Sequence, residues 1–390
     1  MKRLFVIVLA AVLSVPGAAA EAPIKIAHVY DQIGALADYG RQLQVGLALG
    51  FEYATDGSNR VLGRPLVLIE KDSRLQPELA RALLTEAYAE EGAVLAVGPL
   101  APHVALGSLE AAAEQRRILI AQSVADDITG KAWNRYVFRV GRSWSQDAIA
   151  NAIVAARPGA CIATITQDYQ FGRDGIAAYR KAANKLGAIV YHEEYVADSS
   201  RLDAGIERLV AALADRGACR DRHIFAIWAG DGQFLERLLS RQIEANGIRL
   251  TLGGGLLLQE RARQALQSID GAVDYHYLSP ANPVNDWLVV EHLRRFNSPP
   301  SAYVAQGMAE ALFIVAALEK AGSTDTEALI EAMEGLSFLA PKGRLVMRPE
   351  DHQALQPMFH LRIAPEAGRS PLLVREIRAR EIELPIRNRP

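Results

Sequence analysis

Short apolar runs alternate with longer amphipathic segments along most of the chain. Typical runs are IKIAHVY, PLVLIEKD, RILIAQS and CIATITQD. The segments between them, such as PELARALLTEAYAEE and DGIAAYRKAANKLG, carry apolar residues at helical spacing with charged residues opposite. A buried strand followed by an amphipathic helix is typical of a parallel sheet covered by helices on both faces. The pattern therefore predicts an α/β protein.

The number of apolar runs indicates two sheets, because one sheet holding all of them would be unusually large. The irregular stretches RVGRSWSQD and LSPANPVND interrupt the pattern and predict places where the chain crosses between two lobes. The final stretch, REIELPIRNRP, is expected to be weakly ordered. We expect a first lobe of residues 21–140 and 279–341, and a second lobe of residues 141–278 and 342–390 with the C-terminal tail.

The N-terminal residues 1–20 have the pattern of a secretory signal peptide. Lys2 and Arg3 precede an apolar run that ends at Val15, and small residues follow up to Ala20. This pattern predicts cleavage near Ala20 and export to the periplasm. The apolar run is too short to span a hydrocarbon core of about 30 Å, so no direct membrane anchor is expected. Removal of the two basic residues changes the formal net charge from -2 to -4.

Composition narrows the classes of partner. The chain has 390 residues, of which 50% are hydrophobic and 23% are charged, as in ordinary folded proteins. It has no basic excess and no stripe of Lys and Arg interleaved with aromatic residues, so nucleic acid is not an expected partner. The expected partner is a small molecule.

The two cysteines, Cys161 and Cys219, each lie at or just before the start of a predicted strand. Export permits a disulfide between them, and neighbouring parallel strands would bring them together. Two separate buried thiols explain the pattern equally well. Both interpretations remain open from the sequence.

Motifs for catalysis are missing, so the sequence predicts no enzyme and no cofactor or metal. The nucleophile motif G-x-S-x-G does not occur, and the nearest sequence, GRSWS from Gly141, lacks the second glycine. Gly34, Gly40 and Gly46 follow the first predicted strand but are too widely spaced to hold a pyrophosphate. A secreted hydrolase is therefore the least favoured alternative.

Several loops that follow predicted strands carry small, hydroxyl or aromatic residues. Ligands of open parallel sheets bind at the carboxyl ends of the strands, where backbone N–H groups are also available. The loops expected there contain the sequences DYG, PLAPH, QSVAD, DYQFG, WAGDGQ and GGGL. These residue types line a binding cleft and do not by themselves break bonds.

Seven segments occur in an order that resembles a known family: GALADYGRQLQVGLALGFEY, VLAVGPL with RILIAQSVADDIT, YVFRVG, DYQFGRDGIAAY, IWAGDGQFLERLLSRQIEANG, PSAYVAQGMAEAL and KGRLVMRPEDHQALQPMF. The chain resembles the substrate-binding proteins of ABC transporters in the leucine/isoleucine/valine-binding class, from Ile24 to about Ile363. The resemblance implies the type I periplasmic binding fold, with two Rossmann-like lobes joined by a three-crossover hinge. It also implies a monomer that binds a small metabolite between its lobes and delivers it to inner-membrane permease subunits.

The resemblance also implies roles for individual residues. In this family, hydroxyl and backbone N–H groups of the first lobe hold the ligand carboxylate, and aromatic residues cover its apolar part. Tyr39 matches the residue that closes over the ligand. The other matching positions are Leu100, Ala101, Ser123 and Ala125 for the carboxylate, Phe171 in the second lobe, and Tyr303 against the ligand side chain.

The chain departs from the family pattern in the loops expected to contact the ligand. The family's Ser-Pro-Ala-Ala-Thr is replaced by AQSVA, so Ala125 lacks the expected hydroxyl. The loop that often supplies an acid for a ligand ammonium reads GGGLL around Gly254. Without that acid a buried ammonium lacks its counter-charge, and Asp231 is the nearest substitute. Arg142 is either a solvated surface charge or a cleft guanidinium suited to a carboxylate.

These departures lead to a prediction about the ligand. The chain is expected to be a periplasmic receptor for an aromatic or branched organic acid, with a branched-chain amino acid as the competing ligand. The alternative is a ligand-sensing subunit of a regulatory or chemosensory complex with the same fold. That alternative differs in its partner and not in its binding site.

Overall fold

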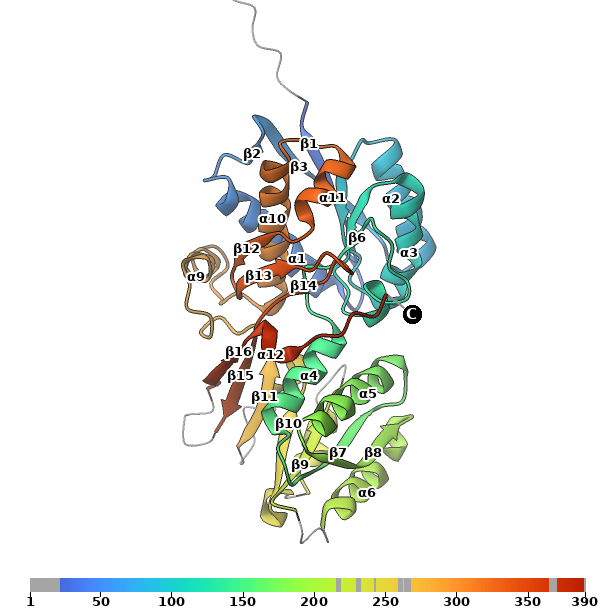
Figure 1. Cartoon of the computed structure of the whole chain (residues 1–390), viewed down its shortest axis with the longest axis vertical. Coiled ribbons are helices and arrows are strands. Elements are labelled where there is room, and N and C mark those ends of the chain that lie inside the picture. The colour runs from blue at the N-terminus through green and yellow to red at the C-terminus, as the bar shows by residue number, and fades with distance from the viewer. Residues whose placement is uncertain are drawn as a thin grey trace, which may run out of the picture.

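The computed structural model describes residues 22–214, 219–228, 233–241, 243–258, 262, 268–364 and 370–388. The described chain forms two lobes, one above the other in Figure 1, each built around its own sheet. Both sheets are mainly parallel, and helices lie against them. The predicted α/β class with two Rossmann-like lobes is confirmed.

The sheet of the first lobe begins with the most buried of the predicted strands. IKIAHVY forms β1 with the bounds that its apolar pattern predicts, and β1 pairs in parallel with β3 and β4. Only β2 is antiparallel to its neighbour. The strand order is β2 (Arg60–Val61), β3 (Arg64–Asp72), β1 (Ile24–Tyr30), β4 (Leu95–Val97), β5 (Ile118–Ile120) and β6 (Val137–Phe138).

In the described chain, six α-helices belong to the first lobe: α1 (Ala37–Ala54), α2 (Pro77–Ala89), α3 (Pro102–Gln115), α9 (Pro283–Phe296), α10 (Ala302–Ala321) and α11 (Thr326–Met333). α1 packs closely on α10, because Gly46 and Gly307 let the two backbones approach. A Cβ atom at Gly46 would lie 2.1 Å from the carbonyl oxygen of Val304. Among the described residues α10 alone is long and apolar enough to span a membrane, and most of it is buried in this core.

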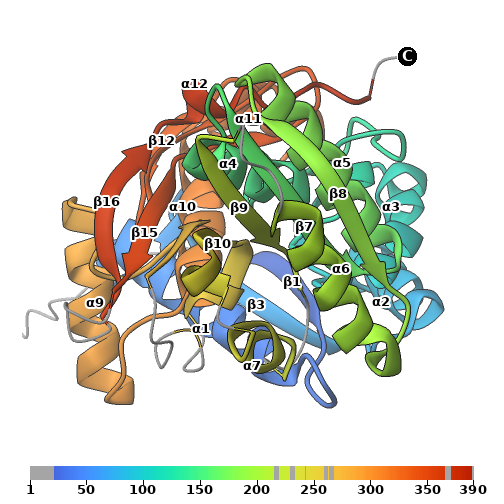
Figure 2. The ribbon, with the colours of Figure 1, turned by 90° about the horizontal axis from the view of Figure 1, so that it is seen from below.

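The second lobe contains a larger sheet, which curves across the view of Figure 2. Five of its strands are parallel, and β15 and β16 are antiparallel additions at one edge. The order is β16 (Leu372–Ile377), β15 (Met358–Ile363), β11 (Ile269–Val273), β10 (Ile248–Leu252), β9 (Asp221–Ala226), β7 (Ala160–Gln167) and β8 (Ile189–Val196).

Helices cover both faces of this second sheet. On one face α4 (Trp144–Ala155) and α5 (Gln170–Lys185) bury a core that includes Tyr179. On the other face α6 (Leu202–Ala214) and α7 (Gln233–Leu239) bury a core that includes Phe234. The short helix α12 (Ala379–Ile382) packs on α4. The described chain also contains short 3-10 helices, at Asp126–Ile128 in the first lobe and at Ser199–Arg201, Ile243–Asn246 and Gly254–Leu258 in the second.

A small antiparallel sheet changes one predicted lobe boundary. It consists of β12 (Ser337–Ala340), β13 (Gly343–Met347) and β14 (Ala354–Leu355). Residues from 342 onward were expected in the second lobe, but Leu345, Met347 and Ala354 are buried in the core of the first. The hydrophobic face of this sheet packs on α10, so the chain returns to the second sheet only at β15.

The chain passes between the two sheets in three stretches: 139–143, 274–282 and 356–357. The first two end at helix N-caps that hold the start of the next helix. Ser143 accepts a hydrogen bond from the backbone N–H of Gln146, at 3.1 Å. Asn282 accepts from the backbone N–H groups of Val284 and Asn285. These caps fix where each lobe resumes after the crossing.

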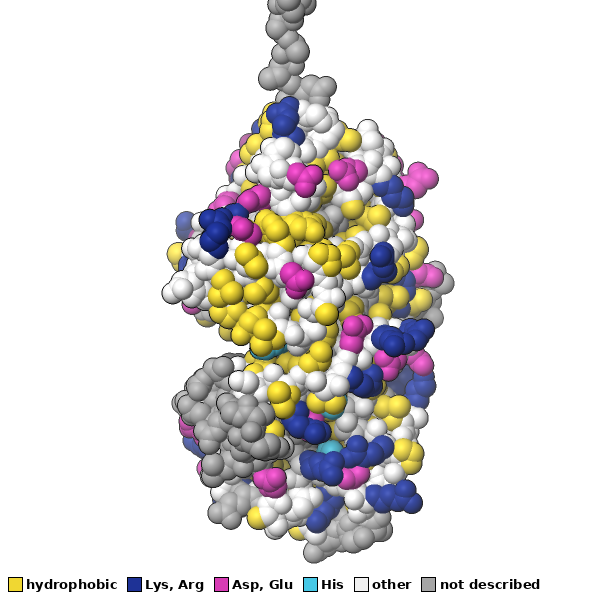
Figure 3. Space-filling view, turned by 90° about the vertical axis from the view of Figure 1, so that its left-hand side faces the viewer, with side chains coloured by type: hydrophobic (Ala, Val, Ile, Leu, Met, Phe, Trp, Pro, Cys, Tyr) yellow, Lys and Arg dark blue, Asp and Glu magenta, His cyan; other side chains and the backbone are white. Residues whose placement is uncertain are grey.

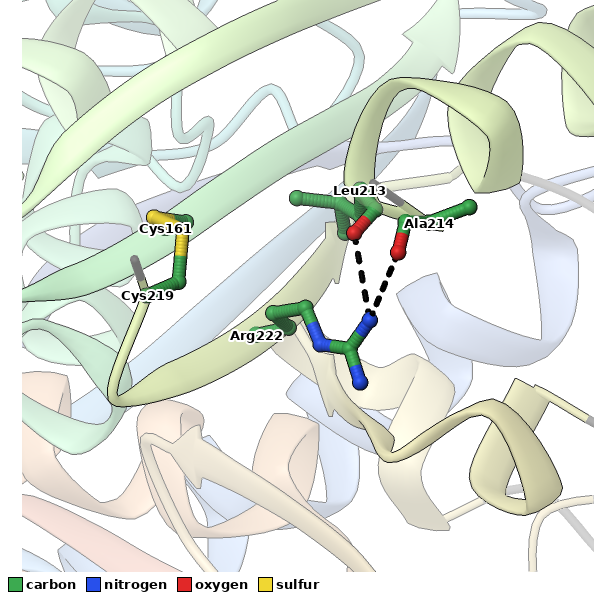
Figure 4. Close-up of a disulfide and its surroundings, with 5 residues drawn as sticks. All are labelled: Cys161, Leu213, Ala214, Cys219 and Arg222. Carbon is green, nitrogen blue, oxygen red and sulfur yellow. Dashed lines mark hydrogen bonds between the residues drawn. A yellow bond between two sulfur atoms is a disulfide. The ribbon is translucent and has the colours of Figure 1, made fainter. Parts of the chain in front are cut away.

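Cys161 and Cys219 form a disulfide in the second lobe, with 5.7 Å between their Cα atoms (Figure 4). The alternative of two separate thiols is therefore wrong. Nearby, Arg222 donates to the carbonyl oxygens of Leu213 and Ala214 at the end of α6 (Figure 4). The surface in Figure 3 has apolar side chains over the upper lobe and a group of Lys and Arg side chains over the lower lobe.

Candidate functional site

The candidate site lies where loops leave the carboxyl ends of strands in both lobes. Leu100 and Ala101 follow β4, Ser123 and Ala125 follow β5, and Gly254 follows β10. In each case the parallel strand ends before the small or polar residue, so the loop turns out of the sheet. Tyr39 lies in the first turn of α1, and Tyr303 lies in the first turn of α10.

Tyr39 and Tyr303 form an aromatic pair. Their ring centroids are 4.6 Å apart and their planes are tilted by 30°. Tyr39 is 40% exposed, whereas Tyr303 is half-buried, and burial raises the pKa of the Tyr303 hydroxyl. The pair therefore presents one rigid, partly exposed apolar surface that ends in polar hydroxyl groups.

Arg142 lies in the first crossing and is paired inside the protein. Its Nε donates to both carboxylate oxygens of Asp147, at 2.8 and 2.7 Å. Its Nη1 donates to Asp274 at 3.5 Å. The side chain is only 15% exposed, so the interpretation of Arg142 as a solvated surface charge is wrong. The guanidinium interacts electrostatically with the Tyr303 hydroxyl, which links Arg142 to the aromatic pair.

Lys342 completes a buried group of four charges, which we call the hinge charge cluster: Arg142, Asp147, Asp274 and Lys342. Lys342 lies in the turn between β12 and β13, with its Nζ 3.8 Å from Asp274 and donating to Gln356. Two of these residues lie in crossings between the lobes, and the other two lie one in each lobe. The cluster thus joins both lobes through opposite charges.

Burial shifts the pKa values of this cluster. It raises the pKa of Asp147 to about 6, because desolvation of the carboxylate outweighs the stabilisation of its charged form by the Arg142 guanidinium. Burial also lowers the pKa of Lys342, against the attraction of Asp274. For Arg142 burial acts in the opposite direction to its two carboxylate partners, and the partners prevail, so its pKa is raised. Arg142 therefore stays charged.

The glycine loop after β10 lies against this cluster. A Cβ atom at Gly254 would lie 3.9 Å from Oδ2 of Asp147, so the predicted site residue and the carboxylate are neighbours. Gly254 has a positive φ of 59°, which favours glycine. A Cβ atom at Gly255 would have no neighbour within 4 Å. Asp147 therefore supplies a carboxylate beside the Gly254 loop, which lacks the acidic residue that the family often has there.

A second buried network includes Gln122, the residue before Ser123. The carboxylate of Glu310 accepts hydrogen bonds from Gln122 at 2.7 Å and from Gln306 at 2.9 Å. Gln122 also lies 3.2 Å from Nε2 of His28. Burial raises the pKa of Glu310 to about 7 and lowers the pKa of His28 to about 4. Gln306 also donates to the backbone carbonyl of Gln122, so α10 holds the β5 loop in place.

The remaining predicted residues are less accessible or lie outside the description. Ser123, Ala125 and Ala101 are buried, and Leu100 is half-buried. Ser123 accepts a hydrogen bond from the backbone N–H of Ala125, at 3.5 Å. Phe171 lies in the first turn of α5, but its side chain is outside the described part of the chain, as is all of Asp231. Their contacts with a ligand stay predictions.

Asp147, Asp274 and Lys342 are missing from the sequence prediction. Asp274 directly follows the buried strand β11, so the strand-end rule would have found it. Asp147 lies on a helix and Lys342 in a turn, where charged residues are ordinary. Only the fold brings them to Arg142. Within the described residues no group of His, Cys, Asp and Glu is arranged to hold a metal ion.

The sequence model of the periplasmic binding protein family matches residues 23–369. The chain belongs to this family. A solved structure of an ABC-type branched-chain amino acid transporter from Rhodopseudomonas palustris CGA009 is 44% identical to this periplasmic binding protein. The match covers 94% of this chain and 100% of that chain, with a TM-score of 0.89.

Two more distant proteins are also similar to this chain. Leu/Ile/Val-binding protein homolog 3 of Brucella melitensis biotype 1 is 23% identical over 316 residues, which cover 80% of this chain and 83% of that protein. A solute-binding protein of R. palustris in complex with benzoate is 20% identical, with a TM-score of 0.72. That match covers 91% of this chain and 96% of that chain, and it shows the shared fold.

The predicted relation to the leucine/isoleucine/valine-binding class is thereby confirmed, as is the type I periplasmic binding fold. Members of this periplasmic binding protein family bind solutes, which is the role the sequence predicts for this chain. The family is one of binding proteins and not of enzymes.

Proposed function

We propose that this periplasmic binding protein is the receptor of an ABC importer for a small carboxylate metabolite. After export and removal of the signal peptide near Ala20, it binds the ligand as a monomer and passes it to permease subunits in the inner membrane. The observation that supports the proposal is the Tyr39–Tyr303 aromatic pair together with Arg142, which interacts electrostatically with Tyr303. These residues come from three distant parts of the chain, and the sequence predicts each of them as a ligand-binding residue.

Each part of the site suits one part of such a ligand. The Tyr39–Tyr303 surface buries the apolar part, and its partial exposure leaves it accessible. The Nη2 group of Arg142 makes no hydrogen bond to the described residues, so it has N–H groups to donate to a carboxylate. Closure of the two lobes over the ligand then excludes water and strengthens these polar contacts.

The charge balance of the hinge charge cluster distinguishes between the two predicted ligand types. The cluster has two cations and two carboxylates, so it is balanced when all four are charged. A simple organic acid adds an uncompensated negative charge to this buried group, which is costly. A zwitterionic amino acid adds no net charge. The balance therefore favours the amino acid.

The two carboxylates also have free capacity to accept hydrogen bonds from an ammonium group. Among the described residues Asp147 accepts only from Nε of Arg142, and Asp274 accepts one long bond of 3.5 Å. A carboxylate can accept about four hydrogen bonds, so both can accept more. Asp147 faces the open glycine loop. We infer that it takes the role first assigned to Asp231, and that a branched-chain amino acid is the preferred ligand.

A thermal-shift experiment with matched ligands tests both the receptor function and the preference for an amino acid. The mature protein is mixed with leucine, or with isocaproate, which has the same skeleton without the amino group. Phenylalanine and phenylpropionate form a second matched pair, and benzoate serves as a short aromatic acid. Binding to the native state raises the unfolding midpoint by mass action. We expect a clear shift with leucine and a smaller one with isocaproate.

The outcomes distinguish failure of the receptor function from failure of the ligand preference. If none of the five compounds, nor any other small carboxylate, shifts the midpoint, the proposed receptor function is contradicted. If isocaproate shifts the midpoint as much as leucine, the function stands but the preference for an amino acid is wrong. Asp147→Asn sharpens this comparison, because it removes an acceptor for the ammonium group and leaves the cluster with one extra positive charge, so the advantage of leucine over isocaproate should fall.

A further inference from the structure

The C-terminal tail returns from the second lobe to the first. The sequence predicts weak order for REIELPIRNRP, but the described part of this stretch is held by contacts. Ile382 is buried with Ile377 against α4, and Leu384 packs beside them. In Figure 1 the chain continues from α12 across the region between the lobes toward the first lobe. The apolar residues that anchor the tail explain why the prediction was wrong.

Residues 383–388, which we call the strap, end on the first lobe. Arg348, which follows β13, donates to the carbonyl oxygens of Leu384 at 2.7 Å and Pro385 at 3.4 Å. Asn388 donates to the carbonyl oxygen of Glu350 at 2.6 Å. Arg387 forms an ion pair with Asp126 at 2.9 Å. All of these partners lie in the first lobe, although the strap is anchored in the second.

Asp126 of the first lobe joins the strap to the residues just after the first crossing. The carboxylate of Asp126 accepts from Arg387 of the strap and also from the backbone N–H and the hydroxyl of Ser145, at 3.1 and 2.6 Å. Ser145 lies in the first turn of α4, immediately after the crossing. A polar cavity of about 10 Å³, room for about one water molecule, lies between the strap and this crossing. One buried carboxylate thus joins the strap, the first lobe and the start of the second.

We propose that the strap is a fourth connection between the lobes, and that it restricts their rotation about the three covalent crossings. Because α12 packs on the second lobe, rotation of one lobe against the other moves α12 relative to Arg348 and Asp126 of the first lobe. The strap between them is short, so it cannot absorb a large displacement. Its contacts with the first lobe are a few hydrogen bonds and one ion pair, and Arg387 is 38% exposed. Such contacts break and re-form readily. The strap therefore limits lobe rotation without locking the lobes.

Spin-label distance measurements test this inference without a ligand, so the result does not depend on the proposed function. The native disulfide uses the two cysteines of the chain, so Glu110→Cys and Asn184→Cys introduce unique labelling sites. These exposed residues lie on α3 of the first lobe and α5 of the second. Distance distributions are compared between the intact strap, Arg387→Gln, and a chain that ends at Glu383. Arg380→Gln, an exposed arginine on α12, is the matched control.

Loss of the strap should broaden the distance distribution and increase its minor population. We expect an increase of about two- to fivefold for Arg387→Gln, the range that exposed ion pairs give. The shortened chain should change more, and Arg380→Gln should match the intact protein. Circular dichroism shows whether the shortened chain folds, and if it does not, Arg387→Gln decides. Distributions that stay unchanged in Arg387→Gln, and in the shortened chain if it folds, would overturn the inference.

Discussion

Glu310 should make the stability of this protein fall as the pH rises toward neutrality. Its carboxyl group is fully buried on α10, and burial raises its pKa from the ordinary 4.5 to about 7. Hydrogen bonds from Gln122 and Gln306 favour the charged form, but they do not outweigh the desolvation. Between these two pKa values the folded state binds a proton that the unfolded state has lost. The stabilisation is therefore complete below pH 4.5 and is lost as the pH rises to about 7.

The substitution Glu310→Gln isolates this effect, because glutamine has the same shape and does not titrate. Asp147 and His28 also titrate in this range, but they are common to both proteins and cancel in the difference. The pKa of Glu310 in the folded state lies about two pH units above pH 5, and each unit changes the free energy of unfolding by about 1.4 kcal/mol. The free energy of unfolding of the variant, relative to that of the wild type, should therefore increase by about 3 kcal/mol between about pH 5 and pH 8.

Urea denaturation at a series of pH values measures this difference directly. Glu319→Gln provides the control, because Glu319 lies on the same helix but is exposed. Its difference from the wild type gives the background against which the Glu310→Gln difference is read. A constant difference for Glu310→Gln would refute the reasoning, since it would mean that the carboxyl group does not change protonation in this range.

Two further predictions concern packing and the disulfide. Gly46→Ala should destabilise the protein by about 3 kcal/mol in urea denaturation, because the new Cβ atom would meet backbone atoms of Val304 and Met308. Gly255→Ala, which has free space, should stay within about 0.5 kcal/mol, and equal losses would contradict the account of the α1–α10 contact. Replacing both cysteines by serine should cost about 4 kcal/mol, because the disulfide closes a loop with a sequence separation of 58. Reduction of the wild type should give the same loss, and an unchanged midpoint would show that the bond does not contribute.

Much of the fold was predictable because buried parallel strands are continuous apolar runs. β1 has the predicted bounds, and β7 differs by one residue at each end of its apolar run. β4 and β5 are shorter than their runs, because the residues after Val97 and Ile120 leave the sheet to form the site loops. Periodicity detects burial but cannot show whether a buried residue lies in a strand or in the loop after it.

The site was predictable only where the resemblance supplied a position. Tyr39 and Tyr303 were selected in this way, and they lie together. The partners of Arg142 were not predictable, because Asp147, Asp274 and Lys342 are separated along the chain and meet only at the hinge. The anchoring of the strap was missed for a similar reason. Its short sequence has no periodic pattern, and its partners Arg348 and Asp126 are distant along the chain.

Calorimetric titration of the mature protein with leucine tests the central claim most directly, in the wild type and in variants of the site. We expect Tyr39→Ala to weaken binding about fivefold to tenfold, because aromatic contacts contribute about 1 kcal/mol beyond their buried area. Tyr39→Phe, which keeps the ring, should bind nearly as well as the wild type. Arg142→Lys keeps the charge but loses the planar guanidinium, so it should also weaken binding. Leucine binding that is absent in the wild type would contradict the preference for an amino acid, and binding that is equally strong in all four proteins would contradict a carboxylate site formed by these residues.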